Sequence, residues 1–209
     1  MGQHGHLARV DELPGPVHIS RHSLPTNAKL PLAMELIRLS PANVCEYRSL
    51  MLEAYSLHLD AFTSSATERE SLPLSWWEQR LSEGEDANEV VFGCVCDNQL
   101  AGVVGLAFER REKTRHKATL FGMYVSAGFR HLGLGGQLMK CALGYAKERH
   151  GVRVIQLTVS EGNLAAQTLY ERSGFIQFGC EPYAIAVGNG FVSKIHMWCD
   201  LSGASPEAS

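Results

Sequence analysis

The chain has 209 residues, 45% hydrophobic and 20% charged, and its formal net charge is −3. This length and composition fit one globular domain with a sizeable core. Acidic and basic residues alternate along the chain, which argues against a nucleic-acid partner. The sequence has no uncharged apolar run near the roughly 20 residues of a membrane helix, so we expect a cytoplasmic protein without a membrane partner.

Residues 1–33 contain four prolines and four histidines and show no apolar periodicity. This composition predicts an extended or poorly ordered N-terminal arm. We expect a single domain over 34–201 and a flexible polar tail over 202–209. The six cysteines are irregularly spaced and form no CxxC pair, which predicts reduced core thiols and no metal site.

In chain order, the pattern predicts a mixed α/β (α+β) fold. Its sheet of six to seven strands is mostly antiparallel, and about four helices flank it. Strands are expected at 34–39, 89–97, 99–111, 118–125, 152–159, 175–187 and 191–201. Helices are expected at 41–59, 134–149 and 163–174, with one or two more in 63–83, broken near Pro73.

The stretch "FRHLGLGGQLMK", residues 129–140, lies between a predicted strand and a predicted helix. It lacks the Lys-Ser/Thr pair of a P-loop, and Leu138 stands where a dinucleotide fingerprint needs its third glycine. It does fit R-x-x-G-x-G/A, with Arg130, Gly133 and Gly135. Free N–H groups at a helix N-terminus and glycines that allow close approach suit a pyrophosphate, with no metal required.

This segment resembles the strand–loop–helix of the GNAT superfamily of acyl-CoA-dependent N-acetyltransferases. A second segment, "NLAAQTLYERSGF" (163–175), matches the family's signature N-x-x-A-x-x-L-Y-x-x-x-G-F at every position. The two segments follow one another in the family's order, with one strand between them. The resemblance implies the family's fold over residues 34–201.

The resemblance also implies a set of acetyl-CoA contacts. The phosphates would be held at Arg130, His131, Leu132, Gly133, Leu134, Gly135 and Gly136. The pantetheine arm would pair with the backbone of Met123, Tyr124 and Val125, where a bulge splays this strand from its neighbour. Asn163 and Ala166 would add contacts, and Tyr170 would donate a proton to the leaving CoA thiolate.

A general base is not evident in the sequence, because Thr119 stands where many relatives carry a glutamate. The candidates are Glu109, Glu161 and His116, each of which also reads as a solvated residue, and a water chain to bulk could serve instead. Tyr55, Trp76 and Trp77 could line the acceptor pocket, but packing against the sheet is an equal alternative.

The resemblance implies direct transfer of an acetyl group from acetyl-CoA to a primary amine in a ternary complex, without an acyl-enzyme or a metal. The acceptor would be a small molecule or an amino acid, and the protein a monomer or homodimer. Two alternatives remain open. One is a non-catalytic acyl-CoA sensor with the same fold, and the other is a nucleotide-dependent enzyme.

Overall fold

The computed structural model describes residues 33–84 and 86–202. The expected arm and tail lie outside these residues, apart from positions 33 and 202. Within the described part, no helix is long and apolar enough to cross a membrane.

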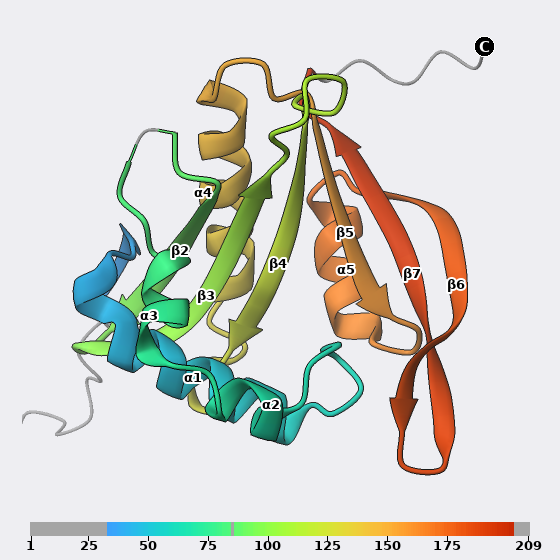
Figure 1. Ribbon diagram of the computed structural model, residues 1–209, viewed down its shortest axis with the longest axis horizontal. Helices are drawn as coiled ribbons and strands as arrows, with labels where there is room; N and C mark the ends of the chain where they lie inside the picture. Colours follow the sequence, from blue (N-terminus) through green and yellow to red (C-terminus); the bar gives the residue numbers. More distant parts are fainter. Residues whose placement is uncertain (1–32, 85, 203–209) are drawn as a thin grey trace, which may run out of the picture. The chain divides into compact units, whose positions relative to one another are not determined.

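Seven strands form one sheet in the order β1-β2-β3-β4-β5-β7-β6 (Figure 1). Their bounds are β1 Met34–Arg38, β2 Glu89–Cys96, β3 Gln99–Phe108, β4 Lys117–Val125, β5 Val154–Ser160, β6 Ile176–Val187 and β7 Gly190–Asp200. Only the β4–β5 pair is parallel. The predicted mixed, mostly antiparallel sheet is therefore confirmed.

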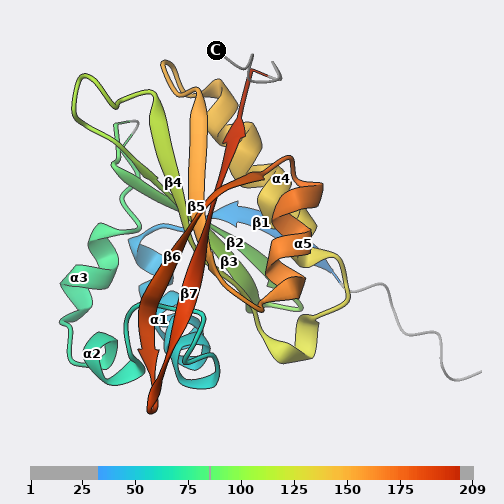
Figure 2. The ribbon, with the colours of Figure 1, turned by 90° about the vertical axis from the view of Figure 1, so that its right-hand side faces the viewer.

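The α-helices are α1 Val44–Leu57, α2 Ala66–Glu70, α3 Leu74–Gln79, α4 Leu134–Glu148 and α5 Leu164–Arg172. The helix expected at 41–59 begins instead as a short 3₁₀ turn, Pro41–Asn43, in which the Ser40 N–H donates to Asn43 Oδ1 at 3.0 Å. The break expected at Pro73 separates α2 from α3. Figure 2 shows α4 and α5 on one side of the sheet and α2 and α3 on the other.

Each face of the sheet has its own hydrophobic core, because successive side chains along a strand point to opposite faces. Val90 of β2 packs with Leu138 of α4 in one cluster, whereas its neighbour Val91 packs with Met51 of α1 and Trp77 of α3 in the other. Both faces of the sheet are therefore covered by helices in the described part of the chain.

The sheet opens between β4 and β5. These strands pair only from Lys117 to Thr119 and then diverge, as their lower ends in Figure 1 show. Residue pairing across β3 and β4 passes from Gly105–Phe121 to Val103–Tyr124, so β4 carries one extra residue. This is a β-bulge, and Gly122 there has φ +62°, a conformation that favours glycine. The bulge and splay expected near Met123 are thus present.

Candidate active site

The glycine-rich loop ends at Gly133, the N-cap of α4, with φ +77°. Within the described residues, the N–H groups of 131–136 donate to no backbone oxygen. Gln137 is the first to close the helix, donating to the Gly133 carbonyl at 3.3 Å. A row of unsatisfied donors at the positive end of a helix dipole suits a phosphate.

The side chains of this loop divide into three groups. Leu134 is buried in the core on the α4 face, so only its backbone is open to a ligand. A Cβ on Gly135 would lie 3.2 Å from Leu169 of α5, whereas one on Gly136 would meet nothing within 4 Å. His131 and Leu132 are exposed. The loop therefore presents mostly backbone.

Arg130 points away from the glycines. Its Nε donates to the Val125 carbonyl at 3.2 Å, and its Nη2 lies 2.8 Å from His58 Nε2 on the segment after α1. The guanidinium also lies 5.9 Å from the ring of Tyr124. Because the side chain is exposed, the phosphate contact expected of Arg130 remains a prediction and requires a different rotamer.

A groove of about 730 Å³ continues from the loop between α4 and α5. Three cationic side chains line it, Lys140 and Lys147 of α4 and Arg172 of α5. The sequence reasoning missed this group. Its signal was the seven-residue spacing of the lysines, which places both on one face of a helix. The groove suits a polyphosphate ligand.

A cleft of about 210 Å³ lies where β4 and β5 diverge. It brings together four residues expected at the cofactor site, namely Met123, Asn163, Ala166 and Tyr170. Asn163 Oδ1 accepts the Ala166 N–H at 3.2 Å, so Asn163 is the N-cap of α5. Lys194 of β7 also lines the cleft, with burial lowering its pKa.

The side chain of Tyr124 does not reach this cleft. It is buried in the core on the α1 face, and its hydroxyl donates to Glu53 Oε1 at 2.8 Å. Burial and the bond to Glu53 raise the pKa of Tyr124 to about 12. Only its backbone can take the pantetheine role expected of 123–125.

Tyr170, in contrast, is 7% exposed and lines the cleft. Burial raises the pKa of its phenol to about 12. The hydroxyl therefore stays protonated at neutral pH, which is the state a proton donor needs.

A second cavity, of about 280 Å³, lies on the α1–α3 face of the sheet. We call it the acceptor cavity. It is lined by Tyr55, Phe62, Thr63, Ser64, Arg69, Arg80, Glu89, Ala107, Thr119, Phe121 and Gly122. Five of these residues also line the cleft, namely Phe62, Thr63, Thr119, Phe121 and Gly122. The two hollows therefore meet at the bulge of β4.

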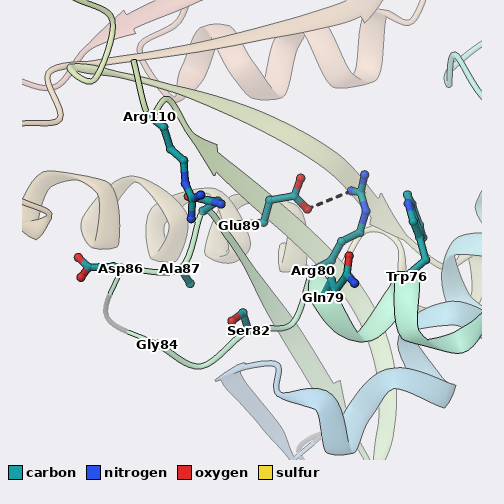
Figure 3. Close-up of a pocket in the computed structure, with 10 residues that line it drawn as sticks. Trp76, Gln79, Arg80, Ser82, Gly84, Asp86, Ala87, Glu89 and Arg110 are labelled. Atoms are coloured by element: carbon teal, nitrogen blue, oxygen red, sulfur yellow. Dashed lines mark hydrogen bonds and ion pairs between the residues drawn. The ribbon is translucent and has the colours of Figure 1, made fainter. Parts of the chain in front are cut away.

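Glu89 is the carboxylate that lines the acceptor cavity. Pairing places Glu89 of β2 opposite Ala107 of β3, and Ala107 opposite Thr119 of β4, in one row across the sheet. All three residues of this row line the acceptor cavity. Glu89 Oε2 lies 3.5 Å from Arg80 Nη1 (Figure 3). The sequence reasoning missed Glu89.

The carboxylates named from the sequence lie elsewhere. Glu109 follows β3 and donates its N–H to the Lys117 carbonyl, at the end of β4 opposite the one that enters the glycine loop. Glu161 is exposed and follows β5, and neither it nor His116 lines the cleft or the acceptor cavity. The structure therefore does not support Glu109 or Glu161 as the base.

The three aromatic residues named for the acceptor pocket have different surroundings. Tyr55 lines the acceptor cavity. Trp76 lines an adjoining hollow, which Figure 3 shows together with Arg80 and Glu89. Arg80 and Glu89 line both this hollow and the acceptor cavity. Trp77 is fully buried and packs edge-on against Tyr47, so it belongs to the core.

Comparisons with known proteins agree with this architecture. Residues 51–175 match the model of the acetyltransferase (GNAT) family. A streptothricin acetyltransferase from Streptomyces lavendulae is 33% identical over 101 residues, which are 48% of this chain and 51% of that protein. The chain thus matches about half the length of this curated relative.

Solved structures show the same fold. An acetyltransferase of the GNAT family from Streptococcus pneumoniae superposes with a TM-score of 0.73 at 22% identity, over 80% of this chain and 99% of that one. The yncA protein of Salmonella typhimurium, solved with its cofactor acetyl-CoA, gives 0.68 at 20% identity, over 85% and 99%. The chain belongs to the acetyltransferase (GNAT) family.

Proposed function

We propose that this protein transfers the acetyl group of acetyl-CoA directly to the amine of a small molecule or amino acid. One observation carries the proposal: the cleft beside Tyr170, at the opening between β4 and β5, shares five lining residues with the acceptor cavity, so the two hollows meet at the bulge of β4. A thioester entering from one side and an amine from the other would meet at this opening, as proximity catalysis requires.

Acetyl-CoA would lie along the path that starts at the glycine loop. The free N–H groups of 131–136 would bind the pyrophosphate, with Lys140, Lys147 and Arg172 supplying positive charge along the groove. The pantetheine arm would enter the cleft and pair with the backbone of Met123–Val125, which β5 leaves open. When bound, acetyl-CoA supplies the activated acyl group.

The chain's own residues would then move two protons. The amine nitrogen forms a bond to the thioester carbon while the C–S bond breaks, and Tyr170 gives its proton to the departing sulfur. A backbone N–H of the bulge would stabilise the negative charge on the carbonyl oxygen. Glu89 would take the proton lost by the amine, directly or through water, since its carboxylate lines the acceptor cavity.

The proposal is tested by measuring release of free CoA thiol from acetyl-CoA with a panel of small amines and amino acids. Acetyl-CoA binding is measured alongside by calorimetry. We expect binding of acetyl-CoA and amine-dependent release, with N-acetylated product detected by mass spectrometry. Tight binding without release for any amine would favour the acyl-CoA sensor. Stabilisation by ATP or NAD but not by CoA would favour the nucleotide-dependent enzyme.

A further inference from the structure

The charged side chains of the acceptor cavity do not balance. Three charged residues line it, Arg69, Arg80 and Glu89. Arg80 and Glu89 form an ion pair at 3.5 Å, which leaves the charge of Arg69. Among the described residues, Arg69 has no carboxylate within ion-pair distance. Its Nε is buried and lacks a hydrogen-bond partner. A buried polar group without a partner is costly, and a ligand that supplies one is favoured.

Aromatic rings hold Arg69 in place. Its guanidinium carbon lies 4.5 Å from the ring centroid of Trp76 and 6.0 Å from that of Tyr55. Arg80 lies 4.3 Å from the same Trp76 ring. Stacked guanidinium groups keep their planar fork of N–H donors and lose little further freedom when they bind a carboxylate. The guanidinium of Arg69, which also hydrogen-bonds to Tyr55, is therefore held in place with its buried Nε still without a partner.

The segment that carries Arg69 is also anchored. Ser65 caps α2, since the Glu68 N–H donates to Ser65 Oγ and the Ser65 N–H donates to Glu68 Oε2 at 2.8 Å. Arg48 of the neighbouring helix α1 donates to the carbonyl of Glu70, the last residue of α2, at 3.1 Å. These bonds fix α2 beside α1, so Arg69 has a defined position at the rim of the cavity.

We propose that the acceptor is a small amino acid, or a close analogue, whose carboxylate is bound by Arg69 while its amine lies at the bulge of β4. This inference rests on the proposed function and names its substrate class. The adjoining cleft carries one charged residue, Lys194, which adds to the positive potential. The cavity of about 280 Å³ lies just below the range of about 300–1,000 Å³ for drug-sized ligands, which fits a smaller acceptor.

The charges that line the acceptor cavity disfavour diamines and polyamines as acceptors. A diamine or polyamine would place a second positive charge beside Arg69, which is unfavourable in a partly buried site. An amino acid instead brings a carboxylate to Arg69 and its amine toward Glu89, so the two charged ends of the ligand match two charges in one cavity. This arrangement predicts a preference for acids over their uncharged derivatives.

The test compares small L-amino acids with their own carboxamides and with the matching amines that lack the carboxyl group, such as L-alanine, L-alaninamide and ethylamine. For the wild type we expect kcat/KM to be at least about 10-fold higher for the acid. In R69Q this preference should fall to threefold or less, through a 10- to 100-fold rise in acceptor KM, while the KM for acetyl-CoA stays unchanged.

Two further variants are controls for charge and folding. R111Q removes the same charge from exposed Arg111, in the loop between β3 and β4 and outside the cleft and the acceptor cavity, and should keep the wild-type preference. R69K keeps the charge but loses the fork, so its acceptor KM should lie between those of wild type and R69Q. If R69Q does not fold, R69K decides: a raised acceptor KM supports the proposal, and an unchanged one overturns it.

The outcomes separate this proposal from the proposed function. Equal or faster turnover of carboxamides and simple amines would overturn the carboxylate site and leave the acetyltransferase standing. Absence of CoA release with every compound, together with no calorimetric binding of the acids to the protein–CoA complex, would overturn it as well. Failure to bind acetyl-CoA would instead count against the proposed function itself.

Discussion

Tyr170 lines the cleft, and its side chain is almost fully buried. Its partner across the opening is Glu89, which comes from a strand on the other side of β4. The two residues are suited to opposite tasks, because one holds a proton at neutral pH and the other is a carboxylate that can accept one. At this scale, proposed catalysis depends on two side chains from opposite faces of the sheet.

Tyr170→Phe should lower kcat by about 10- to 100-fold, because the departing thiolate loses its proton donor. The KM for acetyl-CoA should stay within about twofold, since the ring and its packing remain. With its pKa raised to about 12, Tyr170 stays protonated between pH 6 and 10 and should produce no descending limb in the pH–rate profile there. Steady-state kinetics over this range check both points, and an unaltered kcat would remove Tyr170 from the proton path.

Glu89→Gln should lower kcat/KM for the amine by about 100-fold, with the largest loss where the acceptor is mostly protonated. Glu109→Gln and Glu161→Gln are the matched controls, and each should stay within about twofold, because neither residue lines the cleft or the acceptor cavity. Thermal denaturation shows whether Glu89→Gln still folds without its bond to Arg80. Equal losses in all three variants would contradict the assignment.

At the scale of elements, α4 and α5 approach each other at Gly135. A side chain there would lie 3.2 Å from Leu169, which lines the groove, and 3.4 Å from Met123, which lines the cleft. The glycine therefore leaves room for these two side chains, in addition to freeing the backbone for a phosphate.

Gly135→Val should weaken acetyl-CoA binding by at least about 10-fold, because the added side chain forces Leu169 and Met123 to shift. Gly128→Val, two residues before Arg130, is the control, since a Cβ there meets nothing within 4 Å. Calorimetric titration with acetyl-CoA measures the affinity, and circular dichroism verifies folding. Equal acetyl-CoA affinities for the two variants would show that crowding of Leu169 and Met123 does not affect cofactor binding.

Local patterns predicted the elements around the cofactor site. The strand expected at 118–125 and the helices expected at 134–149 and 163–174 each depend on residues close in sequence, and the structure confirms them as β4, α4 and α5. The location of Glu89 at the acceptor cavity depends on strand pairing instead. A bulge between Cys94 and Val95 shifts the β2–β3 register by one residue, so counting back from the turn misplaces Glu89.

Strand direction explains why Glu109 lines neither the cleft nor the acceptor cavity. The residue follows β3 directly, and β3 runs antiparallel to β4, so its end lies beside the start of β4. Arg69 was missed for a related reason. Nothing local marks it, since its position depends on α2 packing beside α1 and on Trp76, seven residues further along the chain.

At the scale of the whole molecule, the two cores draw on residues from Leu39 to Leu201 among those described. All seven strands and both cavities fall within the predicted domain over 34–201. The domain boundaries remain a proposal, which a truncated protein can test directly.

A chain of residues 33–209 should keep its melting temperature within about 3 °C and its acetyl-CoA affinity within about twofold. The reason is that the core clusters and the cofactor groove use residues after position 33. Differential scanning calorimetry and titration of the full and truncated proteins provide the comparison. Loss of folding or of activity would assign a structural or catalytic role to the first 32 residues.

The short pairing of β4 with β5 has a consequence for local stability. The amide protons of β4 beyond Thr119 should exchange with solvent deuterium faster on the β5 side than those facing β3. Bound acetyl-CoA would slow this exchange by filling the opening. At a concentration 100 times its Kd, it would stabilise the folded protein by about 2.7 kcal/mol. The amide exchange rates at 122–125 would then measure the fraction of the folded protein that has acetyl-CoA bound.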